Sequence, residues 1–421
     1  MNAFFDETGR LLYNSYGLMH LLNMRTLLNN VSFLIIFFFF ITCKSRESKN
    51  ETVLSEAKTS GIDTIHIDLD TISTNFKFKD LFSHVEVILL QTTEKSKVEY
   101  CQKVIVNENN ISNYVLFDAR QLSLFSFDSI GNFVHKSPLH IKESKYEFIH
   151  PWFFSQSNLI YNPYDSLYEF LFGNISKYDS KTLKYIKKEK YNLNAEILSA
   201  FIPLNNDLYV FYAISNKSTE EWGDSIFFYS ISKDSIIKKQ KLLQQIETLH
   251  SLDSPFLSFK NRFFYLPQII SNTIYEIHTD SLSIVPFIVM DYGKKTLNEN
   301  NIDDFYKERN KWDYHELFKS SNYAYLKDMF QNNKSYWFFS LFYGKIFVTV
   351  YDKTEKTIHT ADAGSIASYI PLLTDDILYC AIDTSQIKEV IDSGILTEEN
   401  VNLLSKVKTG VNWVILKCYL K

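Results

Sequence analysis

The sequence predicts an all-β protein: a six-bladed β-propeller with short helical insertions, preceded by a lipoprotein signal peptide and a flexible tether. Three observations lead to this fold class: short segments of alternating apolar and polar residues, a hairpin pattern that recurs along the chain, and many aromatic residues. Aromatic side chains make up 16% of the 421 residues, a composition that can fill large cores and is not that of a disordered chain.

The apolar segment near the N-terminus predicts export. Arg25 supplies a positive start, and residues 31–41 are apolar except for Ser32. A positive start, an apolar stretch of about 7–15 residues and a small-residue boundary describe a secretory signal peptide. A transmembrane helix needs about 20 apolar residues, so this stretch is too short. We assign residues 1–42 to the signal-peptide region.

The first 23 residues do not suit the start of such a signal. Asp6 and Glu7 are acidic, whereas the start of a signal peptide is positively charged. We therefore expect translation to begin at Met24.

The end of the apolar stretch, Phe40-Ile41-Thr42-Cys43, resembles the lipobox of bacterial lipoproteins. In that family the cysteine at this position becomes the diacylated N-terminus after cleavage, and Thr42 stands where Gly, Ala or Ser is usual. The alternative is a short membrane anchor that ends in a chance cysteine. The resemblance implies a lipid on Cys43 that attaches the protein to a membrane, and residues 43–60 are polar enough to form a tether.

Residues 61–421 form the predicted propeller. Alternation with β-branched and aromatic residues is the signature of a strand. The segments with this pattern are 64–69, 85–88, 114–117, 122–127, 132–135, 208–213, 225–231, 272–278, 336–351 and 412–419. The chain has only 11 glycines, so we expect Asn and Asp to occupy many turn positions that need a left-handed backbone.

One degenerate unit recurs: a strand, an aromatic residue, Asp or Ser, a turn and a second strand. It is found at 124–134, 175–183, 228–236, 275–284 and 350–358. Spacings of about 50 residues suit the four-stranded blades of a propeller, although any antiparallel protein contains hairpins. Roughly 300 residues remain for blades once two helical segments are set aside, which favours six blades over seven.

The two helical segments interrupt the β pattern. Residues 296–331 are predicted as an excursion between blades, with short helices at 303–309 and 325–330. Residues 385–406 are predicted as a helix pair, with Thr397 as the N-cap before Glu398 and Glu399.

Four stretches carry a resemblance to the six-bladed β-propeller lipoproteins of Bacteroidota, a family largely without assigned function. They are 82–93, 118–134, 272–293 and 410–421. Residues 118–134 resemble the family's first blade, an Asp followed by a Phe-Asp-x-x-Gly-x-Phe hairpin. Residues 410–421 resemble its C-terminal Asn-Pro-Val strand, with Trp413 in place of Pro. The likeness covers nearly all of the chain from Ile62 and implies one propeller.

Motifs for catalysis, metal binding or cofactor binding are weak. No HExxH, P-loop, dinucleotide fingerprint or nucleophile elbow occurs. The chain offers four sets of polar candidates: His135, His140 and His150 with Asp165 and Glu169; the pair Asp303 and Asp304; the pair Asp375 and Asp376; and Asp68 with Asp70. None has the spacing of a standard ligand set, and adjacent acids on a helix or strand point apart. We predict no catalytic residue, no metal site and no cofactor.

Two further residue types leave alternatives open. Cys101, Cys380 and Cys418 exclude a disulfide scaffold and a zinc site by number and spacing, and one bridge among them is compatible with an oxidising periplasm. The aromatic runs 152–154 and 337–339, and Tyr323 with Tyr325, suit either packing between blades or a stacking platform for a sugar or peptide. Packing is the commoner use.

The favoured function is a lipid-anchored binding module of the cell envelope, for an unidentified protein or glycan ligand. The alternative is a hydrolase or lyase that acts on a glycan or peptide at the central funnel. A formal net charge of −5 argues against a nucleic-acid partner. We expect the outer membrane, and its periplasmic face, because the residues after Cys43 lack the dense acidic run associated with surface export.

Overall fold

The computed structural model describes residues 51–53, 63–70, 72, 76–107, 114–118, 120–139, 158–162, 166–171, 174–179, 182–190, 197–214, 225–241, 255–267, 272–297, 322–364, 366, 372–408 and 412–421. All described residues belong to one compact unit that begins at Glu51. The predicted signal peptide and Cys43 therefore lie outside the described residues. No helix among the described residues is long and apolar enough to cross a membrane.

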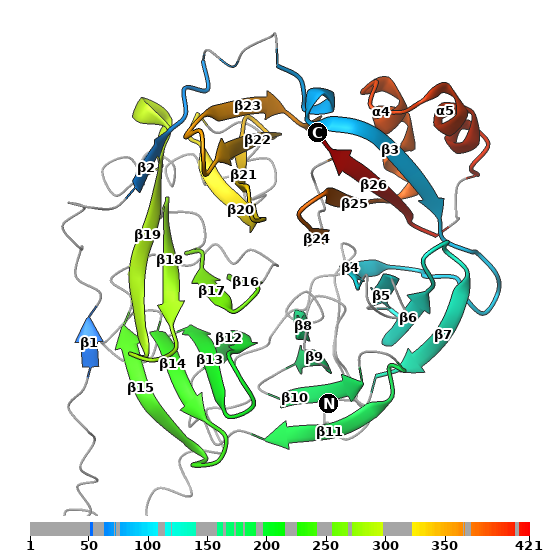
Figure 1. The fold of residues 1–421 in the computed structure, drawn as a ribbon. Helices are drawn as coiled ribbons and strands as arrows, with labels where there is room; N and C mark the ends of the chain where they lie inside the picture. The colour runs from blue at the N-terminus through cyan, green and yellow to red at the C-terminus, as the bar shows by residue number, and fades with distance from the viewer. Residues whose placement is uncertain are drawn as a thin grey trace, which may run out of the picture. The chain divides into compact units, whose positions relative to one another are not determined.

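This unit is an all-β propeller of six antiparallel sheets, as predicted (Figure 1). The first three blades along the chain are β4 (Cys101–Val106), β5 (Tyr114–Asp118), β6 (Ser123–Phe127) and β7 (Phe133–Pro138); β8 (Asn158–Asn162), β9 (Ser166–Leu171), β10 (Asn174–Asp179) and β11 (Tyr185–Lys190); and β12 (Ile197–Pro203), β13 (Leu208–Ile214), β14 (Ser225–Ser230) and β15 (Ser235–Lys241).

The next two blades have the same order from inner to outer strand. They are β16 (Phe256–Phe259), β17 (Arg262–Tyr265), β18 (Thr273–His278) and β19 (Ser283–Asp291); and β20 (Tyr325–Gln331), β21 (Ser335–Phe342), β22 (Lys345–Asp352) and β23 (Ile358–Asp362). Two strands near the N-terminus extend outer edges in parallel: β1 (Glu51–Val53) pairs with β15, and β2 (Asp63–His66) pairs with β19. Inner strands of successive blades contact one another, as in β12 with β16 and β20 with β24.

The sixth blade joins the two ends of the propeller. Its strands are β24 (Leu372–Leu373), β25 (Ile377–Ile382), β26 (Val414–Leu420) and, on the outer edge, β3 (Phe82–Leu89). β3 comes from the start of the propeller and pairs antiparallel with β26 at its end. Opening the ring would therefore break a full strand pairing as well as packing.

Asn412 fastens this closure at the start of β26. Its side chain is almost fully buried, with 2% exposed. Asn412 Nδ2 donates to the carbonyls of Gln91 (2.7 Å) and Ser96 (2.8 Å), and Oδ1 accepts from Val98 N at 2.9 Å. The Asn412 N–H donates to Thr92 Oγ1 at 2.8 Å. Because only an amide offers donors and an acceptor in this arrangement, the asparagine of the C-terminal motif has a structural role.

The five predicted repeat units coincide with the outer hairpins of five blades. These hairpins are β6–β7, β10–β11, β14–β15, β18–β19 and β22–β23. The sixth blade has no such hairpin, because its two outer strands come from opposite ends of the chain. Five repeats in the sequence are therefore what a six-bladed ring closed by β3 should show.

The expectation that Asn and Asp fill the left-handed turn positions is wrong for most described turns. Leu, Lys and Tyr dominate the non-glycine residues with positive φ: Leu122, Leu183, Asp234, Lys260, Leu282, Tyr343 and Lys356. The hairpin aspartate acts earlier in the turn instead. Asp352 Oδ1 accepts from the N–H groups of Thr354 (2.7 Å) and Glu355 (2.8 Å), and this side-chain cap holds the turn whatever residue follows.

Gly131, in the first-blade motif, is required by a close approach. Its φ is +88°, and a Cβ on it would lie 2.3 Å from the carbonyl oxygen of Leu89. Its own carbonyl accepts from Gln91 N at 2.8 Å. The motif glycine thus lets the first blade's outer hairpin touch the end of β3.

The helices match one prediction and contradict another. α4 (Ile387–Asp392) and α5 (Glu398–Ser405) agree with the helix pair expected at 385–406, and Thr397 Oγ1 accepts from Asn400 N at 3.3 Å as the N-cap. The helix expected at 325–330 is wrong, because these residues form β20. A register shift between Leu326 and Asp328 leaves Leu326 and Met329 both buried, a spacing of three that resembles a helix. The helix expected at 303–309 lies outside the described residues.

The aromatic residues pack between blades. Trp337 and Phe339 join the core shared with the sixth blade, whereas Phe338 faces the core shared with β17–β19. Successive side chains of β21 point to opposite faces of the sheet, so one strand serves two inter-blade cores.

Candidate functional site

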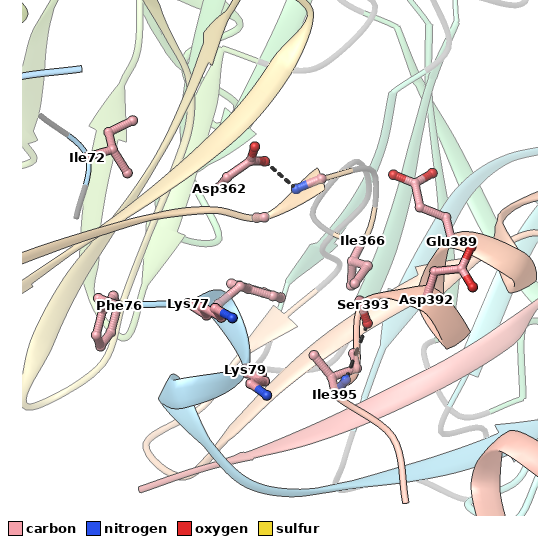
Figure 2. Close-up of a pocket in the computed structure, with 13 residues that line it drawn as sticks. Ile72, Phe76, Lys77, Lys79, Asp362, Ile366, Glu389, Asp392, Ser393 and Ile395 are labelled. Carbon is pink, nitrogen blue, oxygen red and sulfur yellow. Dashed lines mark hydrogen bonds between the residues drawn. The ribbon is translucent and has the colours of Figure 1, made fainter. Parts of the chain in front are cut away.

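A pocket of about 510 Å³ lies beside the closure blade (Figure 2). Three segments form most of its walls: residues 76–79, at the start of the 3-10 helix η1 (Phe78–Leu81); residues 362–364 and Ile366, at and just after the end of β23; and residues 389–395, from α4 to the loop after it. The α4 wall belongs to the insertion between β25 and β26, and the η1 wall precedes β3. The pocket is therefore built largely by chain that is added to the propeller repeats.

The floor of the pocket is apolar and continuous with the core. Phe78, Ala363 and Ile366 are 4%, 3% and 2% exposed and belong to the core cluster of the closure blade. Phe76 forms part of the wall and stacks on the ring of His359 in β23, with ring centroids 5.0 Å apart. A ligand with an apolar body would remove this surface from water, which is worth roughly 25 cal/mol per Å².

Charges of both signs line the rim. Lys77 and Lys79 extend from one wall, and Glu389 and Asp392 lie on the opposite wall (Figure 2). Asp392 accepts from Lys388 Nζ at 2.9 Å along α4, and this hydrogen bond raises the pKa of Lys388. Opposite charges across an apolar floor suit a ligand that carries both a cationic and an anionic group.

Asp362 and Gly364 shape the third wall. Asp362 Oδ1 accepts from Gly364 N at 3.0 Å, and Oδ2 pairs with Lys345 Nζ at 3.0 Å. Gly364 has a φ of +56°, and a Cβ placed on it would lie 3.2 Å from Glu389 Oε1. The missing side chain leaves room for the Glu389 carboxylate at the pocket wall.

No motif in the sequence predicts this pocket. Its lining residues come from three segments separated by up to about three hundred positions, and none belongs to a motif for chemistry. The one local signal is the alternation Phe76-Lys77-Phe78-Lys79, with two aromatic residues between two cations.

Several sequence candidates lie outside the described residues: Cys43, His140, His150, Asp165, residues 152–154, Asp303 and Asp304. His135 lies on β7 with its side chain exposed. Among the described residues, no group of three or more His, Cys, Asp or Glu could hold a metal ion. The prediction that the histidine set binds no metal and the alternative of catalysis at a central funnel are not tested by these residues.

The described acidic candidates have local structural partners. Asp375 Oδ1 accepts from Asn333 N at 2.7 Å, which joins two neighbouring turns. Asp68 Oδ1 accepts from Asp70 N at 2.9 Å, and Asp70 pairs with Lys295. These contacts bring neither pair together with a further carboxylate or a histidine.

Asp118, from the first-blade motif, is also structural. It is fully buried, and its carboxylate accepts hydrogen bonds from the N–H groups of Tyr100 (3.3 Å), Arg120 (2.8 Å) and Gln121 (2.9 Å) and from Gln121 Nε2 (3.0 Å). A buried carboxylate with this many donors is satisfied by the fold itself. Burial of the neighbouring Cys101 thiol, and then the charge of Asp118, raise the pKa of Cys101.

The aromatic candidates divide in the same way. Trp337, Phe338 and Phe339 are at most 2% exposed, so they pack and cannot form a stacking platform. Tyr325 is largely buried, and desolvation raises the pKa of its hydroxyl. Cys101, Cys380 and Cys418 are free thiols, and the hydrogen bond between Cys418 and the buried Cys380 raises the pKa of Cys418.

Comparison with protein families identifies the chain. The model of a family described as 6-bladed beta-propeller (DUF5128) matches residues 55–391. The chain belongs to this six-bladed β-propeller family. The resemblance noted in the sequence is thereby confirmed for the fold and the family.

A solved structure agrees with this fold. A Bacteroides fragilis protein inferred to be exported matches with a TM-score of 0.63 and 14% identity, over 85% of this chain and 99% of that chain. A DUF4221 family member from Bacteroides vulgatus matches with a TM-score of 0.47 and 10% identity, over 80% of this chain and 96% of that chain. At these identities the likeness concerns the fold alone. Comparison with curated proteins gives no match.

Proposed function

We propose that this propeller is a lipid-anchored binding module of the cell envelope and that the pocket beside the closure blade holds its ligand or protein partner. The observation that carries the binding role is the pocket itself, about 510 Å³ with an apolar floor and a rim of both charges. Concave apolar surfaces with a few placed polar groups are the usual form of binding sites. The ligand that suits this site is a peptide-like or other small molecule with both charges.

The proposed address rests on the N-terminal sequence. The lipobox-like Phe40-Ile41-Thr42-Cys43 supports a lipid on Cys43, and the polar residues after it support a tether that holds the propeller near a membrane. We place the protein at the outer membrane, facing the periplasm.

Two measurements test the proposal separately. Intact mass and the N-terminal peptide of the protein from its membrane fraction should show an acylated Cys43, and Cys43→Ser should release the chain from the membrane. An unmodified chain that retains Met1 would overturn the address without touching the pocket.

The pocket is tested by photo-crosslinking in cells. A photoreactive amino acid at Lys79 should give a discrete adduct that disappears when Glu389→Lys reverses the charge of the opposite wall. The same amino acid at Ile186, exposed on β11, is the matched control. Equal adducts at both positions, or an adduct at position 79 that survives Glu389→Lys, would refute the binding site.

A further inference from the structure

A cluster of cations occupies the opposite end of the blade that supplies Asp362 and Gly364 to the pocket. Lys353 lies in the β22–β23 turn, and Lys260 and Arg262 lie in the β16–β17 hairpin. The turn after β20, at Gln331–Ser335, contacts both of these segments. Lys260 Nζ donates a hydrogen bond to Asn333 Oδ1, and Lys353 Nζ donates one to the carbonyl of Asn332. We call Lys353, Lys260, Arg262, Gln331, Tyr336 and Phe259 the Lys353 cluster.

Lys353 is half-buried and has only uncharged oxygen atoms as hydrogen-bond acceptors. Its ammonium donates to the carbonyl of Asn332 and, at 3.4 Å, to Gln331 Oε1. It lies 4.2 Å from the centroid of the Tyr336 ring and 5.9 Å from that of Phe259. Among the described residues no carboxylate forms an ion pair with it.

The neighbouring charges leave this cation uncompensated. Glu276 is committed to Arg262 by two hydrogen bonds, 2.8 Å to Nε and 3.0 Å to Nη2. Asp375 is committed to the backbone and side chain of Asn333. Burial, then the charges of Arg262 and Lys260 against that of Asp375, lower the pKa of Lys353 to about 8. The cluster thus contains three cations, whereas the two carboxylates beside it, Glu276 and Asp375, already accept hydrogen bonds from Arg262 and Asn333.

A buried amide supplies a second sign of a missing group. Gln331 is 4% exposed, and its Oε1 is oriented by Lys353. Gln331 Nε2 is buried and has no hydrogen-bond partner among the described residues. A buried donor without an acceptor destabilises the folded state, so folded proteins rarely leave one unless a ligand or a water completes it.

We propose that the Lys353 cluster is a binding site for an anionic group, a carboxylate or a phosphate. The anion pairs with the Lys353 ammonium and accepts from Gln331 Nε2 directly or through one water, while the Tyr336 and Phe259 rings contact the body of the ligand. Because the Arg262 fork is occupied by Glu276, Lys353 supplies the principal charge. This site is separate from the pocket beside the closure blade and does not rest on its role.

The test uses the full chain in detergent, with sodium phosphate and sodium acetate as the two probes and sodium chloride at equal ionic strength as the reference. Limited acetylation of lysines at pH 7, followed by mass spectrometry, reports the free-amine fraction of each lysine. Lys353 should react faster than an ordinary lysine, because a pKa about 2.5 below the usual value raises the free-amine fraction by roughly two orders of magnitude. Bound anion should slow Lys353 at least fivefold and leave Lys334, exposed in the adjacent turn, unchanged.

Substitutions separate a site from general screening. Phosphate or acetate should raise the melting temperature of the wild type and of Lys334→Met, but not that of Lys353→Met, and Lys353→Arg should keep the effect. Saturation by phosphate alone identifies a phosphate ligand, and saturation by acetate alone identifies a carboxylate. The proposal is overturned if neither salt exceeds sodium chloride, if Lys334 is protected equally, or if Lys353→Met responds like the wild type.

Discussion

The two ends of the blade formed by β20–β23 differ in how their charges are compensated. At the pocket end, Asp362 pairs with Lys345 at 3.0 Å, and Asp392 on the facing helix pairs with Lys388 at 2.9 Å. At the other end, Lys353 is half-buried without a carboxylate. Paired, exposed charges at the rim of a pocket tolerate an empty site, whereas an unpaired, half-buried cation raises the free energy of the folded state until an anion arrives.

The origin of the residues differs as well. The pocket is walled by the segment before β3 and by the α4 insertion, and the Lys353 cluster is made from the turns of the repeats themselves. Insertions can add a binding surface without disturbing the blades, while turns are constrained by the strands they connect. We therefore expect substitutions at the pocket floor to lower the free energy of unfolding more than substitutions at the Lys353 cluster, because the floor belongs to the core of the closure blade.

The largest effect should come from the pocket floor. Phe78→Ala should lower the free energy of unfolding by about 3–4 kcal/mol, because Phe78 is 4% exposed and packs edge-to-face on Phe82 with centroids 4.9 Å apart. The matched change at the other end is Phe259→Ala, which should cost only about 1–2 kcal/mol, because that ring is half-buried. Urea denaturation measures both losses. Similar losses would show that the two side chains contribute equally to the free energy of unfolding.

Two glycine substitutions, with a smaller expected effect, should distinguish backbone strain from a change in the shape of the pocket wall. Gly364→Ala and Gly394→Ala each place a side chain at positive φ, +56° and +70°, and should each cost about 1–2 kcal/mol. Only at Gly364 would the new Cβ meet Glu389 Oε1, whereas nothing lies within 4 Å at Gly394. Crosslinking from position 79 should therefore fall in Gly364→Ala alone. An equal fall in both variants would mean that strain, and not the Glu389 contact, controls the pocket.

The fold was predictable because its signals are local. The alternation of strands, the aspartate-capped hairpins and the N-cap at Thr397 all depend on residues close in sequence. The β20 strand was mistaken for a helix because its bulge changes the spacing of buried Leu326 and Met329, and a bulge depends on the partner strand. Left-handed turns at Leu183 and Lys356 likewise carry no signal of their own, since the preceding Asp179 and Asp352 hold the turns.

The sites could not be predicted from the sequence for the same reason. Lys353 and Gln331 are ordinary polar residues in the sequence, and only the meeting of three turns removes them from water. Conversely, Asp118 and Trp337 attract attention in the sequence but serve hydrogen bonding and packing. Burial of a polar group without a partner, which distinguishes a site, is a property of the tertiary structure.

The free energy of the uncompensated cation should depend on pH. Lys353 binds its proton less tightly in the folded chain, with a pKa of about 8, than in the unfolded chain at about 10.5. Between these values the unfolded chain holds more protons, so the wild type gains stability relative to Lys353→Met as the pH rises from about 8 to 10.5. The gain should be at most about 1 kcal/mol, because the group is partly exposed and screened.

Urea denaturation of both proteins at pH 7, 8.5 and 10 measures this gain, and the difference cancels the titration of other groups. Lys353→Met should be at least as stable as the wild type at pH 7 and should lose that advantage at pH 10. A difference that is constant with pH would show that Lys353 has an ordinary pKa and that its charge is compensated in the folded chain.

The smallest effect should come from releasing Arg262 at the Lys353 cluster. Glu276→Gln removes the carboxylate that occupies the guanidinium and should cost under about 1 kcal/mol of stability, because the pair is partly exposed at 39% and 21%. The freed cation should strengthen anion binding severalfold in the acetylation assay. Glu355→Gln, an exposed acid in the β22–β23 turn, makes the same change in net charge and should leave the affinity nearly unchanged. Equal gains in both variants would assign the effect to net charge, whereas a gain only in Glu276→Gln places the anion within reach of Arg262 as well as Lys353.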